Sequence, residues 1–89
     1  MYQVKIIADV IDPTDPEYIK ANNSVVKASK RFACIREMEH DGNVEIGIFT
    51  FPDKQTCLAF KRCPEHTRAM VKVRKFYRSM QIERSEVEE

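Results

Sequence analysis

The chain has 89 residues, of which 43% are hydrophobic and 33% charged, a composition typical of one globular domain and not of a disordered segment. Its 15 basic and 14 acidic residues nearly cancel, so net charge gives no support for nucleic-acid binding. No apolar run is long enough to cross a membrane and three cysteines form no even disulfide framework, so we expect a cytoplasmic protein without a membrane partner.

Residues 2–11, "YQVKIIADVI", are rich in β-branched side chains and alternate in polarity, which predicts a strand. Its second face, from Gln3 to Ile11, is only half polar, which favours a central strand covered on both sides. A helix start follows, with Asp15 as the N-cap, Pro16 as the first helical residue and Glu17 as an acid in the first turn. The predicted helix covers residues 16–31 and aligns one weakly apolar stripe: Ile19, Asn22, Val26 and Ser29 or Lys30.

A β-hairpin is predicted around Asp41 and Gly42, a turn pair that tolerates positive φ. In the arm after the turn, Val44, Ile46, Ile48 and Thr50 alternate with Glu45, Gly47, Phe49 and Phe51. Pro52 and Asp53 end this strand, and Asp53 or Thr56 can cap a helix that extends to about Arg62.

Pro64 interrupts this second helical region, because proline lacks the backbone donor that a helix interior needs. A new helix from Pro64 to about Ser79 is predicted, followed by a short strand within residues 80–87. The domain is expected to cover residues 1–83, with 84–89 as an acidic C-terminal tail.

This order of elements predicts an α+β fold, the ferredoxin-like βαββαβ sandwich, with the second helix broken at Pro64. Helices cover only one face of such a sheet. The other face is predicted to carry Ile7, Ile11, Phe49 and Phe51, which is too apolar to stay in water. We therefore expect a homodimer in which these faces meet.

The predicted helix 64–79 is amphipathic. Its apolar stripe contains Ala69, Met70, Val73, Phe76, Tyr77 and Met80. The opposite and flanking positions hold Arg68, Lys72, Lys75 and Arg78, which form either a solvated face or an anion-binding face for nucleic acid or an acidic protein. The Gly-rich loop and base-stacking strand aromatics typical of RNA-binding domains are missing.

His66 lies at the N-terminal end of the apolar stripe, where it either caps the helix break, packs in the core or faces a cavity. Cys57, Cys63 and His66 do not have a standard zinc spacing, so no metal site is predicted. A Cys63–His66 nucleophile pair is disfavoured because Pro64 disturbs its geometry.

The segment "VEIGIFTFPDKQTCLAFKRCPEHTRAM" resembles the antibiotic-biosynthesis monooxygenase-like proteins, which have a dimeric α+β barrel fold. It contains, in order, a predicted strand, an aromatic residue followed by a turn with an acidic residue, a short helix, and a Pro-x-His motif at the start of a longer helix. The resemblance implies two sheets packed across a twofold axis, with a small-molecule cavity in each subunit. His66 then matches a histidine that several family enzymes use at their pocket.

The chain departs from the haem-degrading members, which use an asparagine in the first strand and a tryptophan. Asp9 stands in the first strand here and the chain has no Trp, so the resemblance does not extend to haem degradation. It implies instead cofactor-free oxidation of a small aromatic ligand, phenolic or quinone-like, with His66 or Tyr77 handling a proton. Ile7, Phe49 and Met70 are the predicted substrate contacts, and the alternative is a regulatory protein that binds through the basic helix face.

Overall fold

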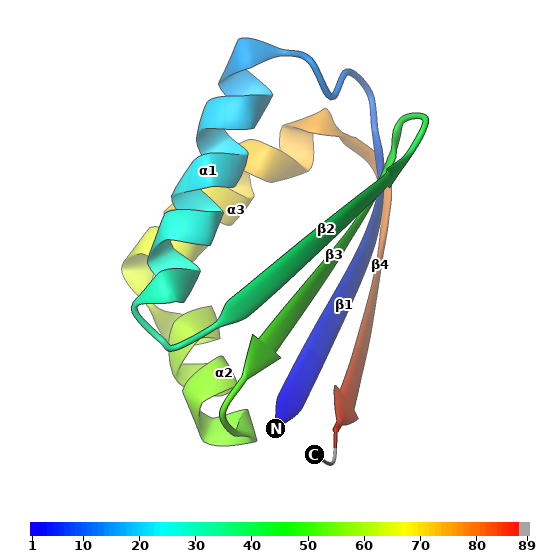
Figure 1. The fold of residues 1–89 in the computed structure, drawn as a ribbon. Helices are drawn as coiled ribbons and strands as arrows, with labels where there is room; N and C mark the ends of the chain where they lie inside the picture. Colours follow the sequence, from blue (N-terminus) through cyan, green and yellow to red (C-terminus); the bar gives the residue numbers. More distant parts are fainter. Residues whose placement is uncertain (88–89) are drawn as a thin grey trace.

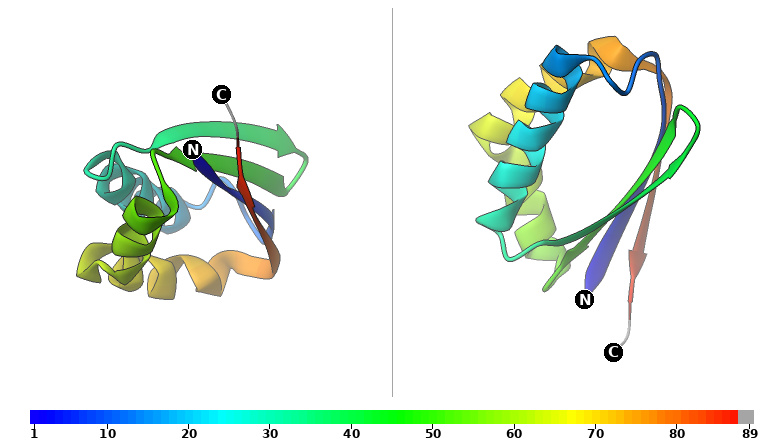
Figure 2. Two further views of the ribbon diagram at one scale, coloured as in Figure 1. Left: turned by 90° about the horizontal axis from the view of Figure 1, so that it is seen from below. Right: turned by 45° about the horizontal axis from the view of Figure 1, so that its top comes forward.

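A four-stranded antiparallel sheet with helices on one face makes up the described part of the chain, residues 1–87, in the computed structural model (Figures 1 and 2). The sheet order is β2-β3-β1-β4, which confirms the ferredoxin-like βαββαβ sandwich and the central position of the first strand. The elements in chain order are β1 (Tyr2–Val10), α1 (Pro16–Lys30), β2 (Ile35–Asp41), β3 (Val44–Phe51), α2 (Lys54–Arg62), α3 (Pro64–Val73), the 3-10 turn η1 (Arg74–Phe76) and β4 (Tyr77–Glu86).

Helix starts follow the local signals in the sequence. The Asp15 carboxylate accepts a hydrogen bond from the Glu17 amide at 2.9 Å, and Asp53, not Thr56, caps α2 by accepting from the Thr56 amide at 2.7 Å. Cys63 separates α2 from α3 with an extended ψ of 143°, as expected for a residue before proline. The predicted break at Pro64 is confirmed.

The buried stripe of α1 differs from the predicted one by one position. Tyr18, Ala21, Val25 and Ala28 are buried together with Ser29 of the predicted stripe, whereas Ile19 is 45% exposed. The position of Tyr18 explains the shift, because its ring packs against Phe76 at 5.6 Å between centroids and its hydroxyl reaches Glu45 in the sheet. A long-range contact therefore decides which side of this weakly amphipathic helix is buried.

The last helix is shorter than predicted and the last strand is longer. α3 ends at Val73, and β4 begins at Tyr77 and continues through Glu86, beyond the expected domain end at 83. The reason is pairing: β4 bonds along the whole of β1, from Tyr2 opposite Glu86 to Val10 opposite Tyr77. Residues 88–89 of the predicted acidic tail lie outside the described residues.

The two faces of β3 are the reverse of those predicted. Glu45, Gly47, Phe49 and Phe51 point to the helices and are buried, with Phe49 7% and Phe51 1% exposed. The prediction that Phe49 and Phe51 lie on the uncovered face is therefore wrong. Burying the largest side chains under two helices removes more apolar surface from water than burying Val44 and Thr50 would.

The sheet face away from the helices, hereafter the outer face, still carries apolar side chains. Ile7 stands opposite Ile46, with Ile48 and Val44 on the same side of β3, and these four residues form the outer patch. Ile7 was correctly expected there. Ile11 lies beyond the end of β1 and is 49% exposed.

The β2–β3 turn gives a direct test of backbone conformation. Asp41 pairs with Val44, so the turn consists of Gly42 and Asn43, one residue later than predicted, and Gly42 has a φ of +60°. Gly42→Val is expected to cost about 1–3 kcal/mol of stability, because a branched side chain strains this conformation. Urea unfolding of Gly42→Val and of the neighbouring control Asn43→Ala measures the effect, and an equal loss in both variants contradicts it.

Candidate functional site

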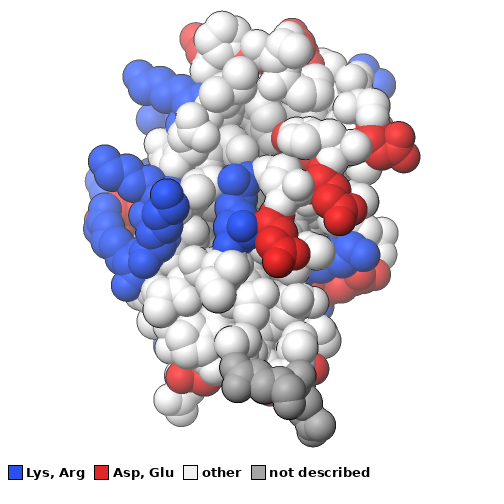
Figure 3. All heavy atoms as spheres, viewed as in Figure 1, with Lys and Arg blue, Asp and Glu red and all other residues white. Residues whose placement is uncertain are grey.

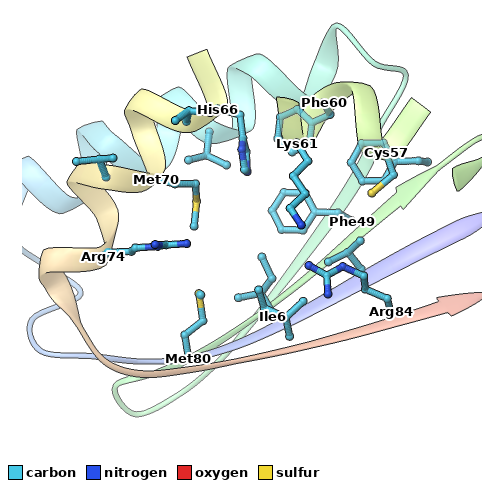
Figure 4. A pocket seen from close by; sticks show the side chains of 16 residues that line it. Ile6, Phe49, Cys57, Phe60, Lys61, His66, Met70, Arg74, Met80 and Arg84 are labelled. Atoms are coloured by element: carbon cyan, nitrogen blue, oxygen red, sulfur yellow. The ribbon is translucent and has the colours of Figure 1, made fainter. Parts of the chain in front are cut away.

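A cavity of about 280 Å³ lies between the sheet and helices α2 and α3 (Figure 4). Buried aromatic residues, Phe49 and Phe51 from β3 and Phe60 from α2, form much of its interior. His66 and Met70 project into it from α3. Such a concave, mainly apolar space with few polar groups is typical of a small-molecule site.

Three of the five residues predicted for the site line this cavity, and two, Ile7 and Tyr77, do not. His66, Phe49 and Met70 all line the cavity, but Ile7 does not, and Ile6 lines it instead. Successive residues of a strand point to opposite faces, so Ile6 faces the helices and Ile7 faces away. The alternation of β1 contained this signal, since Val4, Ile6 and Ala8 form its more uniformly apolar side.

His66 is both packed and accessible to the cavity. Its ring meets that of Phe60 edge-on, at 4.5 Å between centroids and 65° between planes, while its backbone amide donates to the Cys63 sulfur at 3.4 Å. Burial lowers the pKa of His66, a hydrogen bond to the Lys61 backbone partly opposes this, and the positive charges of Lys61 and Arg74 lower the pKa further. The imidazole is thus neutral at neutral pH and can accept a proton.

Tyr77 lies in a separate polar cluster rather than beside His66. A smaller cavity of about 30 Å³ is lined by Tyr18, Glu45 and Tyr77, with the Tyr18 and Tyr77 ring centroids 6.2 Å apart. The Tyr18 hydroxyl donates to Glu45 Oε1, and His40 Nδ1 lies 3.4 Å from Glu45 Oε2. The small and large cavities share four lining residues: Ile6, Val25, Phe49 and Met70.

The chemistry of this cluster limits what Tyr77 can do. Burial raises the pKa of Tyr77, and burial together with the hydrogen bond to Glu45 raises the pKa of Tyr18. Both phenols stay protonated at neutral pH, so they donate hydrogen bonds and do not act as bases. Tyr77 can therefore supply a proton or orient a polar group, but it cannot accept a proton.

Arg36 completes the cluster from β2. Its guanidinium carbon lies 5.7 Å from the Phe49 ring centroid, a cation–π geometry. Within the described residues, its buried Nε has no hydrogen-bond partner, and burial lowers the pKa of this side chain. Sequence reasoning missed Glu45 and Arg36, although a carboxylate that alternates in phase with Phe49 and Phe51 was a detectable signal.

Three basic residues at the mouth of the larger cavity were also missed. Lys61, Arg74 and Arg84 line it and are exposed to solvent. Part of the signal was local: Arg74 follows His66 and Met70 at intervals of four, which places the three on one helical stripe. Arg84 had no such signal, because it reaches the cavity from β4.

Only three of the four residues predicted for the basic face lie together in the structure. Arg68, Lys72 and Lys75 line a groove between α1 and α3, but Arg78 belongs to β4 and does not line it. Lys20, Glu17 and Glu65 also line this groove, so its charge is mixed, with bases in excess. In Figure 3, a cluster of Lys and Arg side chains lies on the side of the helices, while Asp and Glu side chains are more numerous on the side of the sheet, where Lys and Arg also occur.

Within residues 1–87, no cluster of three or more His, Cys, Asp or Glu side chains is arranged to hold a metal ion. In the same range, no helix combines the length and apolar character needed to cross a membrane.

The fold is shared with several solved structures, although neither a known family model nor a curated protein sequence matches the chain. A proposed antibiotic biosynthesis monooxygenase from Caulobacter crescentus aligns with a TM-score of 0.85 and 12% identity, covering 99% of this chain and 90% of the other. A second, from Nitrosomonas europaea, aligns with a TM-score of 0.82 and 12% identity over 98% of each chain. A conserved protein from Methanosarcina mazei gives 0.82 and 10% identity, covering 94% and 89%. The resemblance seen in the sequence thus holds at the level of the fold.

Proposed function

We propose that this chain is a cofactor-free monooxygenase that oxidises a small phenolic or quinone-like molecule. One observation carries the proposal: a neutral imidazole, His66, stands on the wall of a mainly apolar cavity of about 280 Å³. The shared fold of two proposed antibiotic biosynthesis monooxygenases supports it by analogy. The three free thiols, Cys34, Cys57 and Cys63, support a cytoplasmic location as part of the proposal.

The chemistry that this cavity suits begins with proton abstraction. His66 takes a proton from an activated CH₂ carbon next to a phenolic or quinone ring, leaving a carbanion delocalised over the rings. This electron-rich anion reduces O₂ directly, one oxygen atom becomes the new carbonyl oxygen, and the other leaves as water with the two substrate hydrogens. The balanced reaction is R₂CH₂ + O₂ → R₂C=O + H₂O. The apolar walls exclude bulk water from the anion.

Blocking the mouth of the cavity tests this proposal. Thr67 is exposed and lines the cavity, whereas the adjacent Arg68 is exposed and lines the groove on the other side of α3. Thr67→Trp is expected to abolish oxygen uptake with dihydroxynaphthalene substrates, whose keto tautomers carry the activated CH₂ carbon, and Arg68→Trp is expected to retain it. An oxygen electrode with product analysis measures the reaction. Absence of uptake by the unmodified protein across such a panel would remove the proposed activity.

We further propose that the protein is a homodimer formed through the outer patch. Ile7, Val44, Ile46 and Ile48 lie together on the sheet face that no described helix covers. A sheet of this size with an apolar centre gains stability when a second copy covers it. The partner surface is the same patch, as a twofold axis requires.

Replacing Ile46 by Asp is expected to convert the dimer into a folded monomer, because it places a charge at the centre of the outer patch. Sedimentation at micromolar concentration should give a mass near twice 10.4 kDa for the unmodified protein and near 10.4 kDa for the variant. Glu39→Asp, at the paired position on β2, is the matched control. A monomeric unmodified protein would exclude the dimer.

The basic face is a less favoured alternative. Glu17 and Glu65 stand in the same groove as Arg68, Lys72 and Lys75, and Glu65 already pairs with Arg31, its Oε1 lying 3.1 Å from Arg31 Nη1. A nucleic acid would approach these carboxylates as well as the bases, which reduces its binding. Nucleic acid is therefore not the partner that we propose.

A further inference from the structure

Three cations from separate elements surround the mouth of the cavity. Lys61 is the penultimate residue of α2, Arg74 opens η1 and Arg84 belongs to β4. Figure 4 shows that all three side chains extend toward the cavity. No aspartate or glutamate is among the residues that line it, so the charge at this opening is of one sign.

None of these three cations forms an ion pair with an acidic side chain within residues 1–87. The ion pairs within residues 1–87 are Arg31 with Glu65 and His40 with Glu45, and neither involves a residue of the cavity mouth. Cations that converge without internal partners keep their capacity to bind an anion, and low-dielectric walls beneath them focus the field. The arrangement is therefore not a structural ion-pair network.

The positive charges at the mouth affect the pKa values of two groups that line the cavity, His66 and Cys57. The positive charges of Lys61 and Arg74 add to the effect of burial in lowering the pKa of His66, while a hydrogen bond to the Lys61 backbone opposes it. Burial raises the pKa of the Cys57 thiol, and Arg84 and Lys61 oppose that rise. The positive potential thus extends along the cavity from α2 to α3.

We propose that the ligand of this cavity is an aromatic carboxylate, with its rings inside and its carboxylate held at the mouth by Lys61, Arg74 and Arg84. This inference rests on the proposed function and specifies its substrate class. A cavity of about 150 Å³ accommodates one benzene ring, so 280 Å³ suits about two fused rings. With the carboxylate fixed at the mouth, the rings extend toward His66 and Met70.

A matched pair of probes tests the role of charge. Naphthalene-2-carboxylate and its neutral analogue naphthalene-2-carboxamide have nearly the same shape, so their affinities differ mainly through the negative charge. By isothermal titration we expect the carboxylate to bind about tenfold more tightly at low salt and to lose that advantage as salt is raised. The amide affinity should not depend on salt.

Variants locate the effect. Lys61→Gln, Arg74→Gln and Arg84→Gln are each expected to weaken carboxylate binding by about two- to fivefold, as is typical of exposed charge pairs, and to leave amide binding unchanged. Lys75→Gln is the matched control, because Lys75 adjoins Arg74 in sequence but lines the groove between α1 and α3.

The outcomes separate this inference from the proposed function. Equal affinity for the two probes, or equal effects of Lys75→Gln and Arg74→Gln, overturns the carboxylate assignment while leaving the cavity as a ligand site. Failure of both probes to bind the folded protein at millimolar concentration overturns the assignment and also counts against the cavity. Oxygen uptake restricted to neutral substrates preserves the monooxygenase proposal and rejects the carboxylate.

Discussion

His66→Gln is expected to lower kcat by about 10²- to 10⁴-fold, the usual contribution of a general base. Glutamine keeps the polarity and much of the volume of the side chain but cannot accept a proton at neutral pH. Stability should fall by about 1 kcal/mol or less, since His66 is half-buried and its main packing partner is Phe60. Oxygen-uptake kinetics and thermal unfolding of the same preparation separate the two effects.

The chain offers a matched control in its second histidine, His40. Its Nδ1 lies 3.4 Å from Glu45 Oε2, and it does not line the larger cavity. His40→Gln should therefore retain most of the activity. Equal losses in the two variants would show that His66 is not the base.

The pH dependence of His66 has a definite sign. Because burial lowers its pKa below the ordinary value of 6.5, His66 is deprotonated throughout the neutral range and the rate should be flat there. The rate should decline only at acid pH, as the pH falls through the lowered pKa. A rate–pH profile that still rises above neutral pH would contradict the assignment.

The same pKa shift predicts a stability change. Below 6.5 the unfolded chain binds a proton at His66 before the folded chain does, so this group's contribution to stability is present above 6.5 and is lost as the pH falls through the folded pKa. Urea unfolding between pH 7.5 and 5 measures the slope. His66→Gln should remove this part of it.

Phe51→Ala is expected to cost about 3–5 kcal/mol, the usual range for removing a buried aromatic side chain. Phe51 is 1% exposed and its ring centroid lies 5.5 Å from that of Phe60. A domain of this size has only about 5–15 kcal/mol of total stability, so the variant should lose a large share of it. Urea denaturation followed by far-UV circular dichroism measures the loss.

The neighbouring outward residue provides the comparison for Phe51. Thr50 lies on the outer face of the same strand, and Thr50→Ala should change stability by about 0.5 kcal/mol. This pair of variants tests which side of β3 the helices cover. A large loss for Thr50→Ala with a small one for Phe51→Ala would reverse the assignment of the faces.

Local sequence signals determined where most elements begin and end. Asp15 with Pro16, Asp53 and Pro64 fix the helix starts through capping and the missing proline donor, and these interactions involve only residues a few positions apart. Gly42 likewise sets the hairpin by its tolerance of positive φ. These rules are independent of the rest of the chain, so they can be read from the sequence.

Which face of β3 is buried and where the last helix ends were decided only by the tertiary structure. Both faces of β3 are apolar enough to be buried, and only the placement of the helices over Phe49 and Phe51 decides between them. Helix periodicity alone favoured continuing the last helix to Ser79, but pairing with β1 converts Tyr77 onward into β4. Long-range hydrogen bonds outweigh weak local preferences in such segments.

Some residues of the candidate site could be grouped from the sequence, and others only from the tertiary structure. His66 and Met70 share a helical face because they are four residues apart, so the sequence by itself placed them together. Lys61, Arg74 and Arg84 meet only because α2, η1 and β4 end around one opening. Convergence of side chains from three elements depends on how the sheet and helices pack, and no local periodicity encodes that arrangement.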